Sequence, residues 1–166
     1  YLQSFQDSDG SGDPFCDTSD EAVLSKVLND YDLETKDFFN WEVRMSRSEL
    51  SDLVRRRTGI DFGTVRSLEA LERGPSGRIY SLRITGDKCS EVIGKELAIR
   101  HALSESHLKS SAFEISWDGD TLVLEGKGWG HGVGLCQIGA AVMAHKGYDA
   151  GQILLHYYPG TKLERI

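Results

Sequence analysis

The chain has 166 residues, of which 39% are hydrophobic and 27% charged, and its formal net charge is −7. These values predict one compact domain, spanning residues 1–166, with a hydrophobic core of its own. The negative net charge argues against a nucleic-acid partner, because binding phosphates requires a concentrated positive patch. No apolar stretch approaches the roughly 20 residues that a membrane-spanning helix needs.

The N-terminal residues 1–17 are rich in Asp, Ser and Gly, which predicts an extended surface segment. Thr18 and Glu21 follow with the spacing of a capping box, in which two side chains satisfy the unpaired N–H groups at a helix start. We therefore predict a short helix that ends near Leu28.

The stretch FNWEVRMS, residues 39–46, alternates between hydrophobic and polar side chains and predicts a half-buried strand. A second capping box, Ser46 with Glu49, predicts a helix that follows directly and ends at Gly59. The side chains expected to face inward are Leu50, Leu53 and Val54. The basic cluster Arg55–Arg57 is expected to complement the helix dipole rather than to bind a polyanion.

The rest of the chain predicts two pairs of strands and several short helices. A hairpin is expected where residues 65–73 and 78–85 flank the turn sequence GPSG. The further expected elements are a helix at 95–103, strands at 111–117 and 121–134, and helices at 136–146 and 150–157, the last capped by Asp149 with Gln152. Hairpins mixed with short helices predict an α+β fold with an antiparallel sheet, in which a glycine-rich strand leads into a C-terminal helix pair.

The glycine-rich strand carries glycine at every second position from 126 to 134. In a strand these glycines would clear one face, and the opposite face would carry Trp129 and His131. Each interior glycine costs about 0.5–1 kcal/mol relative to alanine, so something is expected to lie close to the bare backbone. Two interpretations stay open: tight packing of a helix or second sheet, and a ligand-facing surface built on the tryptophan platform and a titratable histidine.

The period changes from two to helical after residue 135, so a helix start follows the glycines. Its first turn has unpaired N–H groups that suit a negatively charged or hydroxyl-rich ligand, and Gln137 adds a donor and an acceptor there. A zinc site built from His131 and Cys136, with His145 or His156, matches no standard ligand spacing. We therefore predict no metal and no cofactor, and the pairing of the cysteines stays open.

The stretch GKGWGHGVGLCQIGAAVMAHKGYDAGQILLHYYPGTKL, residues 126–163, resembles the C-terminal signature of the SpoIID/LytB family of stage II sporulation protein D and amidase-enhancer proteins. The shared order is a GxGxGHGVG core, then Q-x-G-A, A-x-x-G and I-L-x-H-Y-Y-P-G-T. Two segments upstream, SGRIYSLRITG at 76–86 and LKSSAFEI at 108–115, resemble the family more loosely.

The resemblance implies a bacterial cell-envelope protein, exported in its full-length form, that acts on peptidoglycan. A lytic transglycosylase of this kind cleaves glycan strands whose stem peptides an amidase has removed, and it assists that amidase. The expected partners are therefore glycan strands and a cell-wall amidase. The candidate catalytic residues are His131 and Gln137. The candidate substrate-binding residues are Trp129, Gly130, Gly132, Gly134, Tyr157 and Tyr158. For the two tyrosines, a helix end packed into the core is the alternative.

The catalytic glutamate of the family lies in a Pro-Ala-Glu stretch that this sequence does not contain. We therefore expect the chain, which starts at Tyr1, to be the C-terminal portion of a longer domain. Glu114 and Glu125 have no motif that distinguishes them from ordinary solvated carboxylates. Two alternatives to an enzyme stay open: a non-catalytic module that binds glycan and recruits or stimulates an N-acetylmuramoyl-L-alanine amidase, and a purely structural envelope domain.

Overall fold

The structure, a computed structural model, describes residues 15–27 and 39–164. The chain divides into two compact units, which are considered separately. We call residues 40–131 the sheet unit, and residues 1–39 with 132–166 the helical unit. The single domain expected for residues 1–166 stays a prediction, and most of the extended segment expected at 1–17 lies outside the described residues.

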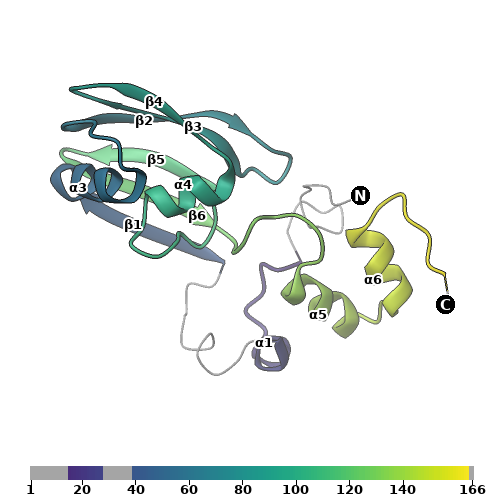
Figure 1. Cartoon of the computed structure of the whole chain (residues 1–166). Helices are drawn as coiled ribbons and strands as arrows, with labels where there is room; N and C mark the ends of the chain where they lie inside the picture. Colours follow the sequence, from purple (N-terminus) through teal and green to yellow (C-terminus); the bar gives the residue numbers. More distant parts are fainter. Residues whose placement is uncertain (1–14, 28–38, 165–166) are drawn as a thin grey trace. The chain divides into compact units, whose positions relative to one another are not determined.

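The sheet unit contains two antiparallel sheets with two helices (Figure 1). The first sheet has the strand order β1-β6-β5 and the second the order β2-β3-β4. In chain order the elements are β1 (Asn40–Ser46), α3 (Arg47–Thr58), β2 (Val65–Arg73), β3 (Ile79–Gly86), β4 (Ser90–Gly94), α4 (Glu96–Ala102), β5 (Phe113–Asp118) and β6 (Thr121–Lys127). The predicted α+β class with antiparallel hairpins is confirmed, although β4 was not predicted.

The start of the sheet unit follows the sequence pattern closely. Trp41 in β1 is buried and its polar neighbours on either side are exposed. At the start of α3 the Ser46 side chain accepts from the Glu49 N–H, and the Glu49 carboxylate accepts from the Ser46 N–H at 2.7 Å. The helix ends at Gly59, whose φ of 75° is left-handed, so both predicted helix signals are confirmed.

One hydrophobic core joins the two sheets and both helices of this unit. Leu122 and Leu124 come from β6, while Leu82 and Ile84 come from β3. The helices add Leu50, Val54 and Ile99, which are fully buried. Because the inward faces of both sheets share this core, the outward rows of each sheet carry the polar side chains.

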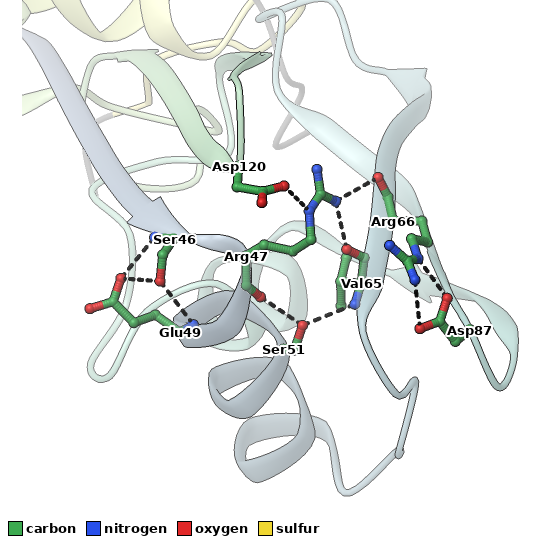
Figure 2. A network of polar contacts seen from close by, with 8 residues as sticks. All are labelled: Ser46, Arg47, Glu49, Ser51, Val65, Arg66, Asp87 and Asp120. Carbon is green, nitrogen blue, oxygen red and sulfur yellow. Dashed lines mark hydrogen bonds and ion pairs between the residues drawn. The ribbon is translucent and has the colours of Figure 1, made fainter.

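Arg47, the first residue of α3, connects the ends of three elements (Figure 2). Its Nε donates to Asp120 in the β5–β6 turn at 3.0 Å, and its Nη1 donates to the Val65 carbonyl oxygen of β2 at 2.8 Å. The guanidinium also lies 4.1 Å from the ring centroid of Trp117, a cation–π contact. One side chain therefore fixes α3 against a strand of each sheet.

The helical unit contains α1 (Glu21–Val27), α5 (Gln137–His145) and α6 (Ala150–Tyr157). The predicted capping box of Thr18 with Glu21 is wrong, because Asp20 caps α1: its carboxylate accepts from the Ala22 N–H at 2.9 Å. Thr18 instead accepts from the Asp20 N–H. The predicted box of Asp149 with Gln152 is present at α6.

A second, smaller hydrophobic cluster forms the core of the helical unit. Its buried members are Phe15, Val23, Ile138, Val142, Met143 and Tyr157. Among the residues that the structure describes, no helix is both long enough and apolar enough to cross a membrane.

Candidate functional site

The glycine-rich segment is not a strand over its whole length. β6 ends at Lys127, so Gly126 is the one alternating glycine that lies within it. The four glycines that follow all have left-handed backbone angles: Gly128 (φ 66°), Gly130 (φ 78°), Gly132 (φ 69°) and Gly134 (φ 74°). The strand predicted to reach 134 is therefore too long, and these glycines serve backbone conformation rather than a cleared face.

Gly126 does serve close packing, against a side chain rather than a helix or sheet. Trp41 of β1 is its cross-strand partner, and a Cβ atom on Gly126 would lie 2.0 Å from Cζ2 of that ring. The indole Nε1 of Trp41 donates to the Gly128 carbonyl oxygen at 3.1 Å. The tryptophan therefore needs the glycine in the strand and holds the backbone just beyond it.

The backbone after β6 is held by the segment that precedes β5. Lys127 donates from its N–H to the Ala112 carbonyl oxygen at 2.8 Å, and its own carbonyl oxygen accepts from Ser110 Oγ at 2.6 Å. The Gly130 N–H donates to the Lys109 carbonyl oxygen at 2.7 Å. Residues 109–112 therefore run beside residues 127–130 and fix their path.

Arg78, just before β3, holds the same loop from a second element. Its Nε donates to the Gly130 carbonyl oxygen at 2.9 Å, and its Nη2 donates to the Trp129 carbonyl oxygen at 3.3 Å. Two consecutive carbonyl oxygens thus share one guanidinium, which restricts the peptide that directly precedes His131. This role of Arg78 carried no signal in the sequence beyond its place in one of the loosely matching upstream segments.

The held loop presents its side chains to solvent. Trp129 is 47% exposed, and the Nζ of Lys109 lies 5.8 Å from its ring centroid. His131 is also exposed, so its imidazole is not sealed in an apolar interior. A half-exposed indole beside a lysine, two residues before an accessible histidine, is a surface that can stack on and hydrogen-bond to a polar ring.

In the helical unit, Gln137 is the first residue of α5 and its side chain is exposed. Cys136 caps this helix, since its Sγ accepts from the Gly139 N–H at 3.5 Å. A serine hydroxyl would cap equally well, which gives Cys136 a structural role. Gly132 and Gly134 lie partly buried before it.

The two candidate tyrosines at the end of α6 differ in accessibility. Tyr157 is fully buried in the core of the helical unit, and its ring meets His156 edge-on at 4.9 Å between centroids. The ring of Tyr157 therefore packs into the core, which is the alternative that the sequence left open, and its role in substrate binding stays a prediction. Tyr158 is partly buried, and its place in a binding surface stays a prediction.

The two candidate acids lie in a row of glutamates that the sequence did not reveal. Glu125 of β6 is opposite Glu42 of β1 on one side and Glu114 of β5 on the other, and all three are exposed. Arg44 lies 3.5 Å from Glu42, and Arg73 lies 3.1 Å from Glu114. Arginines thus flank the row at both ends, and both candidate acids lie on an exposed strand face.

Within the described residues, no group of three or more His, Cys, Asp or Glu side chains is arranged to hold a metal ion. The expected absence of zinc at His131 and Cys136 stays a prediction. The catalytic roles expected for His131 and Gln137 also stay predictions.

A sequence family described as Domain of unknown function (DUF8618) matches residues 1–134. The chain belongs to this family. An uncharacterized protein of Brachyspira hyodysenteriae is 41% identical to this DUF8618 member over 125 residues, which are 74% of the chain and 32% of that protein.

The chain is also similar to two named proteins of Bacillus subtilis. Stage II sporulation protein D is 40% identical over 70 residues, which are 42% of the chain and 20% of that protein. The amidase enhancer is 37% identical over 65 residues, which are 39% of the chain and 9% of that protein. The chain thus spans about a fifth or less of these relatives, and the resemblance to the SpoIID/LytB family is confirmed.

Proposed function

We propose that this DUF8618 chain acts on peptidoglycan glycan strands in the bacterial cell envelope, as part of a longer lytic transglycosylase. The observation that carries the proposal is the loop 127–131, which Arg78 and residues 109–112 hold in place while Trp129 and His131 stay exposed. The relatives named stage II sporulation protein D and amidase enhancer support a role connected with the cell wall.

The chemistry requires one carboxylic acid that protonates the glycosidic oxygen. The same group then accepts the proton of the sugar's 6-hydroxyl, which closes an anhydro ring in place of attack by water. Glu114 is exposed and already forms an ion pair with Arg73 at 3.1 Å. Glu125 lies exposed on a strand face. We therefore assign the acid to a part of the protein outside this sequence.

In this proposal the chain's own residues bind and orient the glycan. The exposed face of Trp129 stacks on a sugar ring, and His131 hydrogen-bonds to the sugar or stabilises developing charge. Gln137 supplies a donor and an acceptor at the start of α5. Held backbone at 127–130 reduces the entropy that the loop loses on binding.

A second candidate function is a non-catalytic module that binds glycan and stimulates an amidase. Two observations favour it: the chain lacks the motif acid, and one relative is named an amidase enhancer. The two candidates share the glycan-binding surface and differ only in whether the longer protein cleaves the strand.

The first experiment measures binding of the whole chain to insoluble glycan strands freed of stem peptides. Trp129→Ala and His131→Ala are each expected to weaken retention about tenfold, the loss of roughly 1.4 kcal/mol. Tyr80→Ala, with a similarly exposed aromatic side chain (45%), and His145→Ala are matched controls that should bind as the wild type does. Equal retention of all four variants would refute the glycan-binding surface.

The second experiment separates the two candidates in the longer protein. Release of anhydro-muropeptides from peptide-free glycan, reduced by His131→Ala, supports the transglycosylase. Stimulation of an amidase without any anhydro product, in a protein that still binds glycan, supports the module and rules out cleavage.

A further inference from the structure

We propose that His101 and His107 together bind one divalent metal ion of the zinc, nickel and copper class. The two residues lie in the sheet unit, at the end of α4 and in the segment that follows it. Their ring centroids are 5.5 Å apart and the ring planes are tilted by 57°. Nothing in the proposed glycan function uses either side chain.

The separation of the rings fits a shared metal ion. With metal–nitrogen bonds of about 2.0–2.1 Å, two imidazoles on one ion have centroids about 5 Å apart at a tetrahedral angle and about 6 Å apart when opposite. The observed 5.5 Å lies between these limits. The tilt of 57° also excludes a parallel stack of the two rings.

The backbone on both sides of the pair is already fixed. Arg57 of α3 donates from Nε to the His101 carbonyl oxygen at 3.0 Å and from Nη2 to the Ser106 carbonyl oxygen at 2.9 Å. Arg100 donates from Nε to the Leu108 carbonyl oxygen at 2.6 Å. The backbone is therefore held at His101 itself and at both neighbours of His107. Such preorganisation reduces the entropic cost of bringing two ligands to one ion.

The imidazoles themselves are available as ligands. Neither ring nitrogen of His101 or of His107 makes a hydrogen bond within the part of the chain that the structure describes. A neutral imidazole is the form that coordinates a metal ion. His107 is exposed, so an ion can enter from solvent.

Imidazole pairs select borderline metals over calcium or magnesium, which prefer oxygen ligands. Two protein ligands leave the remaining coordination positions to water or to an anion. The guanidinium of Arg57 opposes the approach of a cation and keeps the affinity moderate, with Cu²⁺ bound more tightly than Zn²⁺.

The test is a calorimetric titration of the chelator-treated chain with zinc chloride. One ion per chain is expected, and His107→Ala should weaken its binding at least about tenfold because half of the protein ligands are lost. His145→Ala, which removes another exposed histidine, should bind zinc as the wild type does. No binding, or wild-type affinity in His107→Ala, would overturn the proposal.

A second measurement uses the wild-type chain, so it does not depend on the folding of any variant. Substoichiometric Ni²⁺ should broaden the ring signals of His101 and His107 in the NMR spectrum before those of the other three histidines. Broadening that is equal for all five histidines would show adventitious surface binding and reject the paired site.

Discussion

The segment 126–134 contains a glycine that packs against Trp41 and glycines with left-handed backbone angles. We expect replacement by alanine to lower the free energy of unfolding more at Gly126 than at Gly130. In Gly126→Ala, the new Cβ lies 2.0 Å from Cζ2 of Trp41, where ordinary contacts between carbon atoms are about 3.5–4.0 Å. The indole cannot easily move away from the new atom, because its Nε1 donates a hydrogen bond to the Gly128 carbonyl oxygen and its ring packs in the core. Overpacking costs about 1–3 kcal/mol and the lost hydrogen bond about 1 kcal/mol, so we expect a loss of about 2–4 kcal/mol.

Gly130→Ala introduces backbone strain without a steric clash. A Cβ atom there would have no neighbour within 4 Å, and the cost is the left-handed φ of 78°, about 1–2 kcal/mol. Unfolding in urea, followed by far-UV circular dichroism, measures both free energies. In a Trp41→Phe background, which lacks the second ring of the indole, Gly126→Ala should cost at least about 1 kcal/mol less. Equal costs for both glycines, or no coupling to Trp41, would refute this account of the segment.

Three further predictions concern charge and backbone strain in the sheet unit. Glu125→Gln should raise the melting temperature, because it removes like-charge repulsion from a row of three glutamates; a lower value would show that the row is stabilising. Hydrogen bonds from Ser46 lower the pKa of Glu49 below its ordinary value of 4.5. The stability that the charged form adds is thus present above that value and is lost as the pH falls through the lower pKa of the folded state. The advantage of the wild type over Glu49→Gln in urea should therefore be present at pH 7 and shrink as the pH falls below 4.5, and a difference independent of pH would contradict it. Lys95 has a φ of 65° and a ψ of 141°, so Lys95→Gly should stabilise the fold by about 1 kcal/mol in urea, and a destabilised variant would show that the lysine side chain compensates for the strain.

The sequence predicts those elements whose signals are local. The alternation around Trp41, the capping boxes at Ser46 and Asp149, and the hairpin around GPSG all depend on neighbouring residues, and each is present. The strand β4 was not predicted, because its five residues carry no alternation, and it pairs with β3 across a short turn. The pairing of β1 with β6 was equally invisible, since it joins residues about 80 positions apart.

The glycine-rich segment shows why a period of two is an ambiguous signal. Alternating glycines are typical of a strand with one bare face, but they are equally typical of a backbone that turns left-handed at every second residue. Only contacts distant in sequence distinguish the two. Trp41 makes Gly126 a packing glycine, while Gly128 and Gly130 take left-handed angles in backbone that Arg78 and residues 109–112 bond to.

The contacts of Arg78 and residues 109–112 also offer a physical reason why the segments 76–86 and 108–115 loosely resemble the SpoIID/LytB family. The segment 76–86 supplies Arg78, and the segment 108–115 supplies Lys109 and Ser110, which hold the loop that carries His131. If the exposed loop binds glycan, binding requires the residues that hold the loop in place as well as the side chains that the loop exposes. Arg78→Lys tests this link, because lysine keeps the charge but cannot bond to both carbonyl oxygens in the same fork geometry. We expect weaker glycan retention at unchanged melting temperature, and retention equal to that of the wild type would show that the exposed side chains bind without a fixed backbone.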